Sequence, residues 1–115
     1  MNSADKNGRT GKSIERRHPR FPVECDVEVL CGAAVIQAHA IDLSESGIAI
    51  HVPRPVKEGE RVILRFTPPN SEHCFGVQAT VKYTRGSRQG LEFYKLARRE
   101  SDELWRLCRA LSVTA

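Results

Sequence analysis

Two short segments of the chain hold residue types whose spacing suits the binding of an anionic purine nucleotide. Guanidinium groups bind phosphate oxygens and the O6/N7 edge of guanine with two hydrogen bonds, and a carboxylate accepts from the N–H donors on the opposite edge of guanine. The first segment carries three arginines, and the second carries a carboxylate, a hydroxyl and a glycine: Arg16, Arg17, Arg20, Asp42, Ser44 and Gly47. One class of ligand would therefore satisfy both segments.

Length and charge limit the possible functions. The chain has 115 residues, which suits one domain with a single hydrophobic core. Its formal net charge of +4 favours anionic partners, but charge alone does not distinguish a nucleotide from a nucleic acid or an acidic protein surface. Much of the positive charge lies near the amino terminus, in Lys6, Arg9, Lys12, Arg16, Arg17 and Arg20. We therefore expect the anion to bind there.

The cysteines give no support to a metal site or to an oxidising compartment. Cys25, Cys31, Cys74 and Cys108 form no C-x-x-C pair and have no histidine at the spacing of a metal ligand. Cys25 and Cys108 occupy apolar-face positions of a predicted strand and helix, which is typical of buried free cysteine. We predict four free thiols and no bound metal.

Residues 1–13 are polar and lack an apolar run, so they are predicted to form a flexible tail. No segment approaches the roughly 18 apolar residues of a membrane span. The sequence therefore predicts a soluble, cytoplasmic protein that does not insert into a membrane.

Alternation of apolar and polar residues is the dominant pattern and predicts six strands. Within residues 23–29 every odd position is apolar and every even position is acidic, which is typical of a strand with one buried face. Residues 34–41 are more evenly apolar, which predicts coverage on both faces along part of that strand. Further strands are predicted at 46–52, 61–66, 75–83 and 89–94, and in the strand at 75–83 the inward positions are Phe75, Val77, Ala79, Val81 and Tyr83.

The short connections between these strands favour an antiparallel β-barrel. Closure of the sheet removes its exposed edges, and a sandwich is the alternative architecture. After residue 95 the apolar spacing changes to that of an amphipathic helix, with Leu104, Leu107, Cys108 and Leu111 on one face. This helix is expected to pack on the barrel with Trp105 alongside. The predicted fold class is mainly β, a six-stranded antiparallel barrel with a C-terminal helix.

Together these features resemble the PilZ domain. An R-x-x-x-R segment precedes the first strand, a D-x-S-x-x-G segment joins the second and third, and Gly-Leu-Glu-Phe lies in the last. The domain is predicted over residues 14–112. The first motif runs here from Arg16 to Arg20, with Arg17 as an additional basic residue. The resemblance implies a receptor for the bacterial second messenger cyclic di-GMP.

The two motifs are expected to bind different parts of that ligand. Arg16 and Arg20 would meet its phosphate and its guanine O6/N7 acceptors, and Asp42 would accept from guanine N1–H and N2–H₂. Ser44 would add a hydroxyl contact, and Gly47 would adopt a positive φ or leave room for the ligand. Because Asp42 and Ser44 are two residues apart, a strand would place both side chains on one face.

The arginine segment, residues 13–21, is predicted to be mobile without ligand because its neighbouring cations repel one another. Ligand binding would order it and change the surface presented to an effector protein, which the sequence does not identify. The receptor is expected to be a monomer or a weak dimer.

Other functions are weighed against this hypothesis. Each motif alone is also explained as a solvated charged segment or an ordinary turn. A PilZ-like adaptor that binds only protein, independently of nucleotide, is one alternative. An RNA- or single-stranded-DNA-binding barrel is less favoured, because most aromatic residues fall at inward positions, so no nucleic acid polymer is expected. Asp42 and Ser44 lack a nucleophile elbow or metal cluster, so no catalytic residues are predicted.

Overall fold

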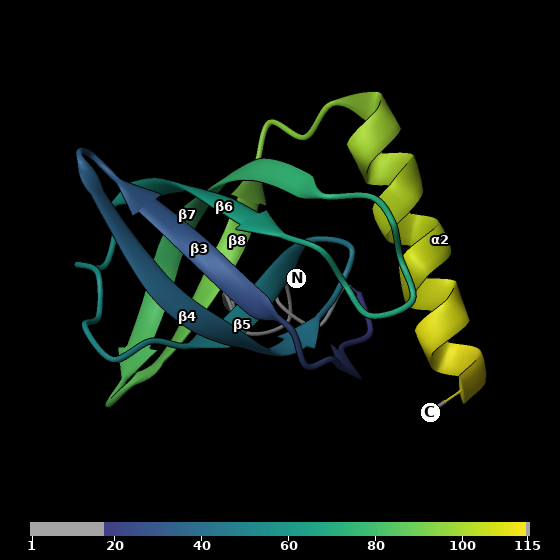
Figure 1. The fold of residues 1–115 in the computed structure, drawn as a ribbon, viewed down its shortest axis with the longest axis horizontal. Helices are drawn as coiled ribbons and strands as arrows, with labels where there is room; N and C mark the ends of the chain where they lie inside the picture. The colour runs from purple at the N-terminus through teal and green to yellow at the C-terminus, as the bar shows by residue number, and fades with distance from the viewer. Residues whose placement is uncertain (1–17, 115) are drawn as a thin grey trace, which may run out of the picture.

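The computed structural model describes residues 18–114, which form one antiparallel sheet and one helix (Figure 1). The predicted tail at residues 1–13 lies outside this part of the chain. The elements are β2 (Phe21–Pro22), β3 (Asp26–Cys31), β4 (Ala34–Leu43), β5 (Gly47–His51), β6 (Arg61–Phe66), β7 (Phe75–Arg85), β8 (Arg88–Tyr94) and α2 (Arg98–Thr114).

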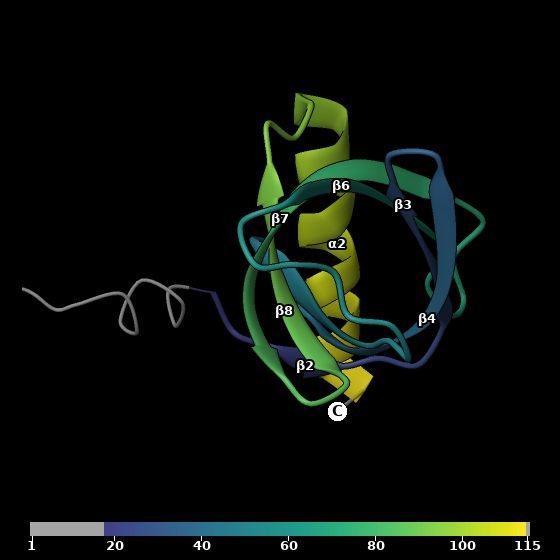
Figure 2. The same cartoon turned by 90° about the vertical axis from the view of Figure 1, so that its left-hand side faces the viewer.

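The sheet closes into a barrel, which is seen end-on in Figure 2. The strand order is β4-β3-β6-β7-β8-β5, and β5 returns to pair with β4. Closure is possible because β4 is ten residues long and uses both of its edges, so that His39 pairs with Asp26 of β3 and with His51 of β5. The short strand β2 adds to β4 as a seventh strand. The predicted fold class, a six-stranded antiparallel barrel with a C-terminal helix, is confirmed.

The predicted alternation fills the interior of the barrel. Every second residue of β6 and the first four predicted inward positions of β7 are buried, and the rings of Phe66 and Phe75 stack with centroids 5.3 Å apart. The core is completed from the other strands and the helix by Val27, Val29, Leu43, Ile48, Ile50, Leu91 and Leu104. Burial of these apolar side chains is the main stabilising term of the fold.

Three details differ from the sequence prediction. Regular pairing of the first long strand begins at Asp26 rather than at residue 23. The first half of β4 is not covered on both faces, since Val35 is 55% exposed. Tyr83 does not point inward, because a bulge between Val81 and Tyr83 inserts one residue and turns the next side chain to the outer face.

Helix α2 lies across one end of the barrel (Figures 1 and 2). It buries Leu104 and Cys108 against the core, as its apolar spacing predicted. Trp105 was expected alongside them but is 48% exposed, with the Arg109 guanidinium 4.9 Å from its ring centroid. Within residues 18–114 no helix is both long and apolar enough to cross a membrane.

Candidate functional site

The turn between β4 and β5 is organised by the hydroxyl of Ser44. This side chain is only 1% exposed, and its Oγ accepts hydrogen bonds from the backbone N–H groups of Ser46 and Gly47, at 3.2 and 3.1 Å. The Ser44 N–H donates in turn to the Gly47 carbonyl at 2.9 Å. A serine at this position therefore satisfies backbone donors that would otherwise be buried without partners.

A bulge in β4 places Asp42 on the outside of the barrel. Ala40 pairs with Ile50 and Asp42 pairs with Ala49, so Ile41 is an extra residue in the ladder. The Asp42 side chain consequently faces outward and is 17% exposed. Ser44 lies beyond the end of β4 with its side chain buried in the turn, so the strand geometry expected for Asp42 and Ser44 does not extend to Ser44.

Gly47 is required by the close approach of two strands. A Cβ atom at this position would overlap the backbone carbonyl oxygen of Leu91 in β8. The φ of Gly47 lies outside the left-handed region, so the predicted positive φ is wrong. The glycine lets β5 pack tightly against β8 at the point where the turn ends.

Arg20 joins the two predicted motifs. Its Nη1 donates to Asp42 Oδ1 at 2.8 Å, across 22 positions of sequence. The short strand β2 makes this contact possible. Pro22 of β2 pairs directly with Asp42, and Arg20 lies only two residues before Pro22. Arg16 and Arg17, the other two arginines of the predicted site, lie outside the described residues.

A second arginine on the same carboxylate was not among the predicted site residues. Arg88 Nη2 lies 3.4 Å from Asp42 Oδ2, so each carboxylate oxygen faces its own guanidinium. The neighbouring Tyr83 side chain raises the pKa of Arg88, and the Asp42 carboxylate adds to this increase. No motif in the sequence marks Arg88 as a site residue. It lies at the start of β8, where it pairs with His51 of β5.

The resulting charge pattern suits an anion. Two guanidinium groups surround one carboxylate, which leaves a positive surface on the outer face of the barrel. Both ion pairs are partly exposed, and such pairs typically contribute about 0.2–1 kcal/mol to stability. Either arginine can therefore exchange the Asp42 carboxylate for another anion at little cost in free energy.

The β4–β5 turn lies near helix α2 and near the segment before β2. Glu45 Oε1 lies 4.0 Å from His18 Nε2. Burial raises the pKa of the Cys108 thiol to about 11, and the nearby Glu45 carboxylate adds to this increase. One turn thus faces both the arginine segment and the helix.

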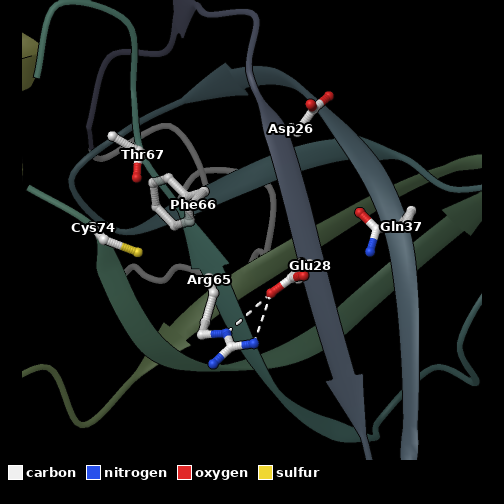
Figure 3. A pocket seen from close by; sticks show the side chains of 7 residues that line it. All are labelled: Asp26, Glu28, Gln37, Arg65, Phe66, Thr67 and Cys74. Atoms are coloured by element: carbon white, nitrogen blue, oxygen red, sulfur yellow. Dashed lines mark hydrogen bonds and ion pairs between the residues drawn. The ribbon is translucent and has the colours of Figure 1, made fainter. Parts of the chain in front are cut away.

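A separate groove of about 570 Å³ lies on the outer face of β3 and β6 (Figure 3). Across it Arg65 donates to Glu28 Oε1 at 2.8 Å. None of the described members of the predicted site lines this groove. In the part of the chain from 18 to 114, no three His, Cys, Asp or Glu side chains gather as ligands for a metal ion.

Comparison with known proteins gives a family for this barrel and its paired motifs. The family model for the PilZ domain matches residues 14–110. The chain belongs to the PilZ domain family. No curated protein matches the chain in a sequence search.

Solved structures share the PilZ fold. The Bacillus subtilis inhibitor of motility, MotI/DgrA, aligns with a TM-score of 0.73 and 20% identity over 99% of this chain and 57% of that protein. The chain thus spans little more than half the length of that protein. The PilZ domain of YcgR from Escherichia coli, solved with c-di-GMP, aligns with a TM-score of 0.70 and 15% identity over 86% of this chain and 92% of that one. The PilZ domain of CeSA from a cellulose-synthesizing bacterium aligns with a TM-score of 0.65 and 19% identity, over 82% of this chain and 98% of that one.

Proposed function

We propose that this PilZ protein is a receptor for cyclic di-GMP and that it acts by binding rather than by catalysis. The observation that carries the proposal is the 2.8 Å ion pair between Arg20 and Asp42, which brings the two motifs to one place on the barrel. The PilZ domain of YcgR, solved with c-di-GMP, supports the choice of ligand.

Binding would exchange charged partners at the Asp42 carboxylate. Guanine N1–H and N2–H₂ would donate to the Asp42 oxygens, and Arg20 would turn from Asp42 to a phosphate or to the O6/N7 edge of a guanine. The weak coupling expected of a partly exposed ion pair favours this exchange. Arg16 and Arg17 would add charge from the preceding segment.

Ser44 and Gly47 would act mainly by holding the turn in shape. The Ser44 hydroxyl already accepts two backbone hydrogen bonds, and Gly47 is packed against β8. The predicted hydroxyl contact between Ser44 and the ligand would require this hydroxyl to give up its donation to the Gly47 carbonyl, 3.4 Å away.

Signalling would follow from ordering of residues 13–21 over the outer face of the barrel. The ordered segment would present a new surface to an effector protein, at a cost in conformational entropy that lowers the net affinity. In this proposal the protein works in the cytoplasm, where the second messenger acts. Amide exchange of residues 13–21 should slow with saturating ligand, and unchanged exchange would contradict the ordering step.

Calorimetric titration tests the choice of ligand. The protein would be titrated separately with cyclic di-GMP, GTP and a single-stranded RNA oligonucleotide. Saturable heat with cyclic di-GMP alone is expected. Heat with RNA would select the nucleic-acid-binding alternative, and no heat with any of the three would select the nucleotide-independent adaptor.

A further inference from the structure

Three apolar side chains lie side by side on the outer face of β4, β3 and β6. Leu30 of β3 pairs with Val35 of β4 on one side and with Ile63 of β6 on the other. Val29, the residue before Leu30, is buried in the core, so Leu30 and its two cross-strand partners face outward. Val35 is 55% exposed and Ile63 is 45% exposed. Leu30, Val35 and Ile63 form the apolar row.

The apolar row is more than scattered exposure of single side chains, which is common on protein surfaces. In the described part of the chain three large hydrophobic side chains are exposed, and the third is Trp105 of α2. The other two lie on either side of the half-buried Leu30. Residues 34–41 also have the evenly apolar pattern of a strand covered on both faces. A continuous apolar surface of this kind is typical of a face that another molecule covers.

The polar residues next to the apolar row carry both signs of charge. Two residues further along each strand, Gln37, Glu28 and Arg65 form the adjacent outward row and line the groove in Figure 3. Arg65 Nη2 donates to Glu28 Oε1 at 2.8 Å, so this row has no net charge. On the other side of Ile63, the Arg61 guanidinium lies 3.7 Å from the ring centroid of Tyr94 in β8, away from β3. The row is therefore bordered by one acid and one base that a partner surface must match.

A second copy of this chain has the surface that matches. A two-fold axis parallel to β3 and passing over Leu30 would place Val35 of each copy against Ile63 of the other. Leu30 would then contact Leu30 of the other copy, and Glu28 would lie between its own Arg65 and that of the other copy. Because a two-fold interface uses the same patch on both subunits, a patch that holds both signs of charge does not repel itself. This local neutrality allows association although each chain has a formal net charge of +4.

We propose that the apolar row is the centre of a two-fold interface between two copies of this chain. Val35 lies near the start of β4 and Asp42 near its end, about 20 Å away along the strand, so the interface leaves the Arg20–Asp42 pair uncovered. Residues 1–17 offer little that could cover the row instead, because only Met1 and Ile14 among them are large and apolar. The inference does not depend on the proposed ligand.

Sedimentation velocity at increasing protein concentration tests the interface. The row is small compared with the roughly 20–30 residues that each partner contributes to a standard interface, so a weak dimer is expected at high concentration. Val35→Lys and Ile63→Glu each place a charge against an apolar side chain of the other copy, and each should weaken the dimer about tenfold or more. A wild-type protein that stays monomeric up to about 1 mM would overturn the proposal. Unchanged association in both single variants would overturn it as well.

The double variant Val35→Lys/Ile63→Glu tests the two-fold arrangement itself. With the proposed axis, the new cation of each copy faces the new anion of the other copy. The double variant should therefore dimerise more strongly than either single variant. A double variant as weak as the single variants would contradict the arrangement, since it would show that Val35 and Ile63 do not meet across the interface.

Trp105→Lys is the matched control, because it replaces the third exposed large hydrophobic residue and leaves the apolar row intact. It should dimerise like the wild type. A monomeric Trp105→Lys variant beside dimeric Val35→Lys would place the interface on α2 and overturn the proposal. Thermal unfolding of each variant would show that the fold is retained.

A measurement on the wild-type protein avoids substitutions altogether. On dilution of the isotopically labelled protein, amide resonances should shift in the segments that carry the row, around Leu30, Val35 and Ile63. Those of α2 should stay unchanged. Concentration-dependent shifts confined to α2 or to the surroundings of Asp42 would contradict the proposal, and so would resonances that do not move at all.

Discussion

The α-carbon of Gly47 faces the carbonyl oxygen of Leu91 so closely that no side chain fits between them. This contact fixes the end of the β4–β5 turn against β8. Phe93 N–H also donates to the Ser46 carbonyl at 2.9 Å, so the turn is joined to the backbone of β8 at both Leu91 and Phe93. The shape of the turn that follows Asp42 therefore depends on β8 as well as on its own sequence.

Replacing Gly47 with alanine should destabilise the protein, because the neighbouring atom is backbone and cannot rotate away. We expect a loss of about 1–3 kcal/mol in the free energy of unfolding, typical of overpacking, measured by urea denaturation. Gly76→Ala is the control, since a Cβ at Gly76 meets nothing within 4 Å. Equal stability of the two variants would show that β5 and β8 separate easily at this point.

Ser44→Ala should also destabilise the fold. It removes the acceptor of the Ser46 and Gly47 N–H groups, and an unsatisfied buried donor typically costs about 1–3 kcal/mol. Denaturant unfolding measures the change. Ser112→Ala on the exposed face of α2 serves as the control, because surface substitutions usually stay within about 0.5 kcal/mol. A stability equal to that of the control would mean that water replaces the hydroxyl.

Arg20→Ala should weaken cyclic di-GMP binding by about ten- to a hundredfold, because charge-assisted hydrogen bonds contribute about 1.5–3 kcal/mol. Calorimetric titration gives the affinity. Arg65→Ala removes an equal charge from the separate groove on β3 and β6 and should bind like the wild type. Unaltered binding by Arg20→Ala would show that the ligand site lies elsewhere.

The stability of the fold should fall between about pH 9 and pH 11. Burial raises the pKa of the Cys108 thiol to about 11, with Glu45 adding to the increase, and burial followed by the Asp26 carboxylate raises that of Cys25 to about 11. A folded-state pKa above the unfolded value stabilises the protein below the unfolded pKa of about 8.5–9, and this stabilisation is lost as the pH rises through the folded pKa.

Chemical denaturation at pH 8, 9.5 and 10.5 measures this loss. Cys108→Val removes one of the two thiols and should reduce the dependence on pH. At pH 8 the exposed thiol of Cys74 should react with a disulfide reagent faster than the thiol of Cys108. Equal rates, or a pH dependence unchanged by Cys108→Val, would contradict the burial of this thiol.

Much of the fold follows from local sequence patterns. Strand β6 matches its predicted range because apolar residues stand at every second position, Val62, Leu64 and Phe66, and the spacing of Leu104 and Cys108 predicts the buried face of α2. The turn glycine Gly32 has a positive φ between β3 and β4, as expected for a tight hairpin. These signals are local, so a single sequence contains them.

The site could be predicted only in part. Residue types and a family motif indicated Arg20 and Asp42, and the structure brings them together. Arg88 was missed because its contact with Asp42 depends on the register of two successive strand pairs. The outward position of Tyr83 was missed because a bulge adds one residue to a strand without a distinct local signal. The ligand roles of the described site residues stay predictions.

The bulge at Ile41 determines that the Asp42 side chain faces the outside of the barrel. In a regular strand, residue 42 would lie on the same face as the inward-facing Ala38 and Ala40 and would point into the hydrophobic core. A strand that kept Ile41 in regular pairing would therefore bury the Asp42 carboxylate and turn Leu43 out to water. The irregular pairing at Ile41, rather than the identity of its side chain, separates the polar from the apolar residues here, because it lets Asp42 face outward while Ala40 and Leu43 both stay in the core.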